Sequence, residues 1–277
     1  AVFPRSSFIL PLIGMLTYRE ARTPAREALD RIGPQCAHAL SEALADESVD
    51  FGIRVNIPFA LTLWATREVS DRLIQNLLIQ DSGMIRFKIL RALAQMRRVN
   101  SELTFDDAML TESTQRTLRS AYVLLNWYWL LEEGGREEPS RTTPGHELLS
   151  TLIHDKYEHA LDRLFRHLDL IYSEEDFGRI KRGLWSRDDD DVASSLELLE
   201  NLLISPLRET VLGLVKPASE RVDRRERLSH APLDLELKEE SYDQLLMAIL
   251  TSNSESLRAV GAYHIGELGL SEFRDAL

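Results

Sequence analysis

Apolar side chains follow helical spacing along nearly the whole chain, recurring at positions i, i+3, i+4 and i+7. Strict alternation of apolar and polar residues, which marks a half-buried strand, is almost absent. The one strand-like stretch, residues 233–237, is too short and too isolated to build a sheet. The pattern therefore predicts an all-α protein.

Short polar turns join the predicted helices of the first hundred residues into pairs. The turns "TYRE", "ADES" and "QDSG" give helical pairs near residues 5–32, 34–65 and 67–98. Connections this short force neighbouring helices to pack antiparallel. Pro58 lies inside the second helix of the middle pair, and we expect it to kink a continuous helix over 50–65. The alternative is that the helix starts at Pro58, but the periodic match of Ile53 and Ile57 with the other copies favours the kink. Residues 1–100 are thus predicted to form a regular array.

The pattern changes after residue 100. Residues 105–133 and 146–172 read as two long helices, joined by a polar loop dense in glycine and proline. They predict a long helical hairpin within 101–172. The rest of the chain predicts a degenerate pair over 173–215, a charged linker over 216–240 and a last pair over 241–277.

An arginine preceded by an apolar or small residue recurs along the chain. Arg22, Arg54 and Arg86 are 32 residues apart, and Arg258 occupies the same place in the last pair. Seven residues after each arginine stand Leu29, Leu61, Leu93 and Ile265. Six residues after, three copies carry alanine and the fourth carries His264. Such a period indicates stacked supersecondary units, and we expect Arg54 and Arg86 to be buried between units and hydrogen-bonded to the preceding one.

This pattern resembles HEAT repeats, the armadillo-like helical pairs that stack into a superhelix. "LRAVGAYHIGELG" (257–269) and "ILPLIGML" (9–16) carry the resemblance most clearly, and the matching stretches make up roughly half of the chain. The resemblance implies an α/α superhelix, a HEAT-like solenoid, with the hairpin inserted.

A narrower stretch, "HALDRLFRHLDLIYSEEDFGRIKRGL" followed by "SSLELLENLL", is similar to a region of large bacterial proteins. In those proteins HEAT repeats join a transporter-like part that resembles ATP/ADP carriers, often with a cyclic-nucleotide-binding domain. The similarity implies a cytosolic connector within a larger protein.

Charge and cysteine content narrow the class of partner and compartment. The chain has 33 Lys and Arg against 45 Asp and Glu, a net charge of −12, which disfavours binding to nucleic acid or anionic lipid. A single cysteine, Cys36, cannot form an intramolecular disulfide and fits a reducing compartment. The longest apolar run, 121–131, is shorter than the roughly 20 residues that span a bilayer. We expect a cytoplasmic segment, on the cytosolic face of the inner membrane if its parent is transporter-linked.

The first residue is not Met, and the last helical pair has no polar capping repeat after it. We therefore expect a piece of a longer protein, with apolar end faces that flanking domains cover.

The side chains that could bind a metal ion do not converge on one helix face. His154, Asp155, Glu158 and His159 cluster on one helix, with Asp162 and His167 beyond. The two nearest histidines are five residues apart, about 140° around the helix, so they cannot chelate one ion as an HExxH pair does. We expect a solvated polar face, a buried Cys36, and no catalytic, metal-binding or cofactor-binding residues.

The triplet Trp127, Tyr128 and Trp129 spans about 200° of its helix, so its side chains cannot all face one side. One interpretation places at least one of them against a partner, since exposed Trp and Tyr are enriched at binding hot spots. The other, which we favour, is that the hairpin is packed on two sides within the chain.

These observations predict a non-catalytic scaffold whose helices present a surface to a protein partner or to flanking domains. The alternative is a HEAT-repeat enzyme, such as a bilin-lyase-like protein, which a co-purifying coloured tetrapyrrole would reveal. A DNA glycosylase of this architecture needs a basic groove, and the net charge argues against it.

Overall fold

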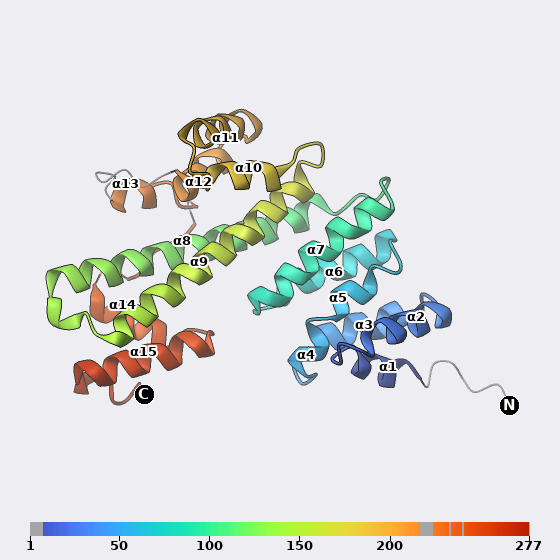
Figure 1. The fold of residues 1–277 in the computed structure, drawn as a ribbon, viewed down its shortest axis with the longest axis horizontal. Coiled ribbons are helices and arrows are strands. Elements are labelled where there is room, and N and C mark those ends of the chain that lie inside the picture. Colours follow the sequence, from blue (N-terminus) through green and yellow to red (C-terminus); the bar gives the residue numbers. More distant parts are fainter. Residues whose placement is uncertain (1–7, 217–223, 233, 240, 277) are drawn as a thin grey trace. The chain divides into compact units, whose positions relative to one another are not determined.

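The computed structural model describes residues 8–216, 224–232, 234–239 and 241–276, and all regular structure within them is helical (Figure 1). This confirms the all-α prediction. The chain divides into two compact units: unit 1 comprises Ala1–Thr114 and Phe165–Phe177, and unit 2 comprises Gln115–Leu164 and Gly178–Leu277. None of the described helices combines the length and apolar character needed to cross a bilayer.

Unit 1 is built from short helices that pack in pairs. In chain order they are α1 (Ile9–Met15), α2 (Arg22–Ile32), α3 (Cys36–Ala45), α4 (Phe51–Arg54), α5 (Ile57–Leu61), α6 (Arg67–Ile79) and α7 (Gly83–Val99). Within pairs, α1 packs on α2, α3 on α5, and α6 on α7. Between pairs, α1 contacts α3, α3 contacts α6, and α5 contacts α7. We call α1, α3 and α6 the first-helix layer, and α2, α5 and α7 the second-helix layer.

Local sequence sets where several of these helices begin. The Thr66 hydroxyl accepts a hydrogen bond from the Val69 N–H at the start of α6, and the Ser82 hydroxyl accepts from the Ile85 N–H at the start of α7. Such caps satisfy donors that have no partner inside the helix. By fixing the residue at which each helix begins, the caps help to set which side chains lie on its buried face.

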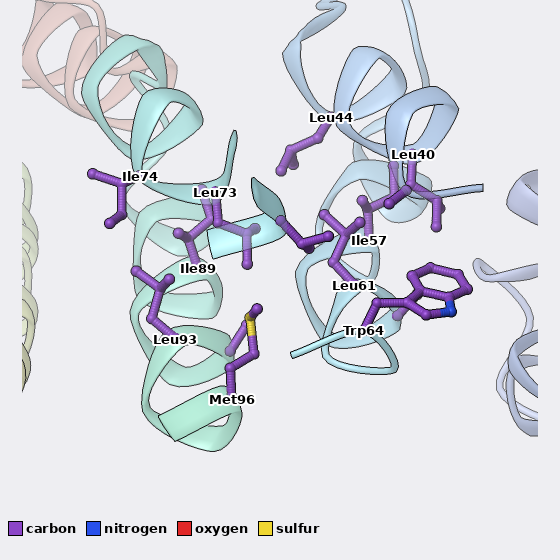
Figure 2. Packing of buried hydrophobic residues seen from close by; sticks show 14 of the residues in the cluster. Leu40, Leu44, Ile57, Leu61, Trp64, Leu73, Ile74, Ile89, Leu93 and Met96 are labelled. Atoms are coloured by element: carbon purple, nitrogen blue, oxygen red, sulfur yellow. The ribbon is translucent and has the colours of Figure 1, made fainter. Parts of the chain in front are cut away.

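The recurring apolar positions of the sequence form the core of unit 1 (Figure 2). The leucines seven residues after Arg22, Arg54 and Arg86 are completely buried. The alanines six residues after Arg54 and Arg86 are also buried, which lets the helices approach closely. Removing one such leucine side chain is expected to cost about 2–5 kcal/mol, because a core this tightly packed relaxes little. The apolar residues that recur at a fixed distance after each arginine are therefore the residues that are buried.

Pro58 breaks its helix rather than kinking it. The structure has two short helices, α4 and α5, joined by a turn at Val55 and Asn56, so the predicted continuous helix over 50–65 was wrong. Proline has no N–H to donate to the carbonyl of Arg54, and it sits comfortably in the first turn of α5.

The long hairpin consists of α8 (Asp107–Glu137) and α9 (Pro144–Ile171), with the short 3-10 helix η2 (Pro139–Arg141) in the loop. In unit 2 the Tyr128 ring packs edge-on against His154, and the Ser150 hydroxyl donates to Glu132 at 2.6 Å. Tyr128 precedes Glu132 in α8, whereas their partners follow the opposite order in α9, so the two helices are antiparallel. Both helices contribute to both units. The hairpin is therefore not a segment of its own, as the predicted boundaries at 101 and 172 implied.

The remaining helices belong to unit 2, apart from the first residue of α10. They are α10 (Phe177–Leu184), α11 (Asp189–Leu202), α12 (Leu207–Val215), α13 (Arg224–Leu228), α14 (Tyr242–Leu250), α15 (Glu255–Leu268) and the 3-10 helix η3 (Ser271–Phe273). α11 packs on α12, and α14 on α15.

The described part of the predicted linker over 216–240 packs on unit 2. Arg227 is buried, and Asn126 of α8 donates to the Glu239 carbonyl at 3.2 Å. The charged composition of 216–240 predicts a linker, but the buried Arg227 and the Asn126–Glu239 hydrogen bond hold the described part of this segment against unit 2.

Candidate functional site

The recurring arginines fasten the two helices of one pair together. Arg22 Nε donates to the Leu16 carbonyl at 2.9 Å, and Arg258 Nη1 donates to the Ser252 carbonyl at 2.6 Å. These carbonyls lie just beyond the first helix of each pair, where no intrahelical N–H reaches them. A cation at that end also complements the helix dipole. Arg22 and Arg258 therefore act as C-terminal caps.

Arg54 extends this arrangement to the following pair. Its Nε donates to the Leu44 carbonyl at 3.2 Å and its Nη2 donates to Gln80 Oε1 at 2.7 Å. Gln80 Nε2 in turn donates to the same Leu44 carbonyl at 3.0 Å, which closes a buried triangle between α3, α4 and the end of α6. Arg54 and Arg86 are 8% and 4% exposed, so their predicted burial is confirmed. The predicted bond from Arg54 to the preceding pair was wrong, because the uncapped carbonyl belongs to its own pair.

Arg208 makes the same kind of bond, although the recurrence of arginines along the sequence had not included it. Arg208 Nε donates to the Leu203 carbonyl at 2.8 Å, just beyond α11, as α12 begins. The signal was present: Leu207 precedes the arginine and Val215 follows it by seven residues, as in the other copies. The degenerate pair over 173–215 thus keeps the cap although it has lost most of the repeat.

The aromatic triplet of α8 packs within unit 2. Trp127 is buried, whereas Tyr128 and Trp129 are half-buried. Tyr128 lies against His154, and the guanidinium of Arg227 lies 5.8 Å from the Trp129 ring centroid. Trp127 is thus covered within the chain, and Tyr128 and Trp129 each lie against a neighbour in unit 2.

The polar cluster of α9 is spread over different neighbours. His154 packs between two tyrosine rings, while Asp162 pairs with Lys181. Within the described residues, no group of three or more His, Cys, Asp or Glu side chains could hold a metal ion. His167 lies in unit 1, where its Nε2 is 2.9 Å from the Ser113 hydroxyl. Both side chains of that Ser–His pair are completely buried, so no substrate reaches the hydroxyl.

Cys36 is buried on α3, with its Sγ 3.7 Å from the Leu29 carbonyl. Burial raises the pKa of its thiol, which disfavours the nucleophilic thiolate.

The most elaborate polar cluster joins the α8–α9 loop to the last helical pair, all within unit 2. His264 stands where other copies carry alanine, and it is completely buried. Its Nδ1 lies 2.9 Å from the Thr143 hydroxyl and its Nε2 lies 2.5 Å from the Tyr242 hydroxyl. Gly145 permits this approach, since a Cβ there would lie 3.0 Å from the His264 Cα. The imidazole therefore fills a space that the loop leaves open.

Glu267 places a carboxylate beside this cluster. Hydrogen bonds, that of Thr143 above all and also those of the Tyr263 hydroxyl and the Gly145 N–H, lower the pKa of Glu267, so the carboxylate is ionised. A hydroxyl thus lies at each ring nitrogen of His264, Thr143 at Nδ1 and Tyr242 at Nε2, and the tautomer of the imidazole sets which of the two donates.

Burial keeps His264, His146 and Tyr242 in their neutral forms. Burial, reinforced by the adjacent His146, lowers the pKa of His264 to about 4, and burial also lowers the pKa of His146. Burial raises the pKa of Tyr242 to about 12. At neutral pH the imidazole is therefore uncharged and the phenol keeps its proton. A pocket of about 270 Å³ adjoins Tyr242, lined mainly by charged side chains that include Glu133, Glu137 and Arg141.

The second-helix layer of unit 1 has a different surface chemistry. Phe59 is the one large side chain of α5 that is exposed, at 52%, and the Arg26 guanidinium of α2 lies 3.9 Å from its ring centroid. Helical spacing places Lys88, Arg91 and Arg98 on the outward side of α7, where the last two are exposed. We call Arg26, Phe59, Lys88, Arg91 and Arg98 the basic face.

The two helices that carry most of this face, α5 and α7, contain no carboxylates. Residues 51–67 and 82–101 contain no aspartate or glutamate, although the whole chain has 45 among 277 residues. The acidic residues of the second-helix layer, Glu27 and Asp30, both lie on α2. The net charge of −12 thus conceals a surface of opposite sign.

The first pair also exposes apolar side chains, namely Leu10 and Met15 of α1 and Tyr18 beyond it.

Comparison with models of known families, with curated proteins and with solved structures finds no match to this chain.

Proposed function

We propose that this chain is a non-catalytic, HEAT-like helical scaffold that binds a protein partner through the second-helix layer of unit 1. Support for the solenoid part comes from the contacts of unit 1, where each pair packs on the next in sequence. An array of this kind offers extended surface more readily than an enclosed pocket. The arginine caps and buried leucines are the parts that would hold such an array together.

The observation that carries the binding proposal is Phe59. Phe59 is 52% exposed on α5, and aromatic side chains are enriched at protein–protein interfaces. Arg26 lies over the ring and holds it in place, so the side chain loses little further freedom when a partner covers it. Arg and aromatic residues are the types enriched at interface hot spots.

The polar clusters support a non-catalytic reading. Each ring nitrogen of His264 faces a hydroxyl of the chain, and the Tyr242 phenol remains protonated at neutral pH. A general base needs a free acceptor within reach of a substrate proton, and this imidazole has none to offer. The pocket beside Tyr242 is also smaller than the 300–1,000 Å³, roughly, of typical ligand sites.

The proposal includes a cytoplasmic location, which the single buried cysteine favours. Membership of a larger, transporter-linked protein rests on the resemblance of residues 159–203 alone.

Site-specific photo-cross-linking in cells tests the binding proposal. A photoreactive phenylalanine analogue at position 59 is expected to give one dominant protein adduct. The same analogue at Ile79, an exposed apolar position (61%) on α6 of the first-helix layer, serves as the matched control and is expected to give none. Adducts that are absent at both positions, or equal at both, would argue against a binding surface at Phe59. A coloured tetrapyrrole that co-purifies with the chain would instead favour the lyase alternative.

A further inference from the structure

The chemistry of the basic face identifies the kind of partner that it fits. We infer that the basic face binds an acidic segment of another protein, one in which carboxylates flank an aromatic or aliphatic side chain. The inference rests on the proposed function and adds the partner's charge and the residues that recognise it. It follows from three features of the described part of unit 1.

The first feature is unpaired positive charge. Lys88 and Arg98 form no ion pair with any described residue, and Arg91 makes only a distant contact to the Phe87 ring, 5.9 Å from its centroid. By contrast, exposed arginines on α2 and α6 are held by i,i+4 carboxylates, as in Arg31–Glu27 and Arg67–Asp71. Lys88, Arg91 and Arg98 are therefore available to a partner without breaking an ion pair among the described residues.

The second feature is the linear arrangement of these cations. Lys88, Arg91 and Arg98 lie along one side of a 17-residue helix, so that they follow each other over three turns. A segment that runs along α7 could place successive carboxylates against them. Charges in such a row steer a partner of opposite sign and set its register.

The third feature is the apolar centre beside this row. Phe59 of α5, with Leu63 half-buried one turn on, lies in the helix that packs directly on α7. An acidic segment that also carries an aromatic or aliphatic residue would cover this centre while its carboxylates meet the cations. A polyanion without such a residue, nucleic acid included, would use the charges and leave Phe59 in water.

Fluorescence anisotropy with the purified chain tests this inference. The probe is a labelled synthetic peptide in which pairs of glutamates alternate with single phenylalanines. A matched peptide replaces every glutamate by glutamine, and a single-stranded oligonucleotide of the same net charge completes the set. We expect the acidic peptide to bind about tenfold more tightly than the glutamine peptide, and more weakly as salt is raised.

Charge reversal locates the binding. The double variant Arg91→Glu/Arg98→Glu is expected to lose about tenfold in affinity for the acidic peptide. Arg187→Glu, at an exposed position of unit 2, carries the same kind of charge change and is expected to stay within about twofold. Because all three positions are exposed, far-UV circular dichroism should show unchanged helix content.

Each remaining outcome overturns the inference. Equal affinity for the two peptides removes the role of charge, and equal losses in the Arg91/Arg98 and Arg187 variants remove the role of this face. Oligonucleotide binding as tight as acidic-peptide binding assigns the face to nucleic acid instead. If cross-linking at Phe59 still captures a protein while the peptides do not differ, the scaffold proposal survives and only the acidic partner is wrong.

Discussion

Replacing Arg54 by alanine should destabilise unit 1 far more than the same change at Arg258, although both arginines occupy the same position of the repeat. Arg54 is buried and donates to the Leu44 carbonyl and to Gln80 Oε1, whereas Arg258 is exposed and donates to one carbonyl. The Arg54→Ala variant leaves the buried Gln80 oxygen without this donor. Hydrogen bonds to charged groups are worth about 1.5–3 kcal/mol each, and relief from burying the guanidinium offsets part of that loss. The expected net cost is about 3 kcal/mol.

Hydrogen exchange followed by mass spectrometry measures this cost within unit 1 alone. Slowly exchanging amides of α3 and α6 should exchange about a hundredfold faster in Arg54→Ala, since each 1.4 kcal/mol, roughly, is a factor of ten. Arg258→Ala should leave these amides unchanged. A double-mutant cycle with Gln80→Ala should show a coupling of about 1–2 kcal/mol. Exchange in Arg54→Ala that matches the wild type would refute the triangle as a stabilising element.

Three further predictions concern unit 2. The free energy of unfolding, measured by chemical denaturation, should fall by about 2 kcal/mol between pH 7.5 and pH 5. The reason is that the unfolded chain protonates His264 near pH 6.5, whereas the folded chain does so only near pH 4. In His264→Asn the free energy of unfolding should depend much less on pH across this window. Nitrogen-15 NMR at pH 7 should find a neutral His264 imidazole, and a protonated ring there would contradict the lowered pKa. Gly134→Ala should destabilise by about 1–3 kcal/mol, since the new Cβ would lie 2.1 Å from the Tyr242 ring. Gly266→Ala, where nothing lies within 4 Å, should instead stabilise by up to about 1 kcal/mol in thermal unfolding.

The sequence predicted the helices of unit 1 well because their apolar period and short turns are local signals. The buried leucines at positions 29, 61 and 93 could be named from the recurrence alone. The break at Pro58 was missed for an equally local reason: the apolar positions on both sides stay in phase across two short helices and a turn.

Contacts between residues that lie far apart in the sequence could not be predicted from apolar spacing and turns. His264 was noticed as a departure from alanine, but its partner Thr143 is 121 residues away and belongs to a loop whose position only the fold determines. Spacing also gives no direction for an arginine side chain, so the bond of Arg54 within its own pair could not be foreseen. The basic face was hidden because a net charge averages over all surfaces.

Phe59 is the centre of the proposed binding surface, and the affinity of the Phe59→Ala variant for the cross-linked partner tests this directly. Isothermal titration calorimetry should show a loss of about thirtyfold, the effect of a hot-spot residue worth about 2 kcal/mol. Ile79→Ala removes a comparably exposed apolar side chain and should change the affinity less than about twofold. Equal affinities for wild type and Phe59→Ala, with both proteins folded, would contradict the proposed binding surface.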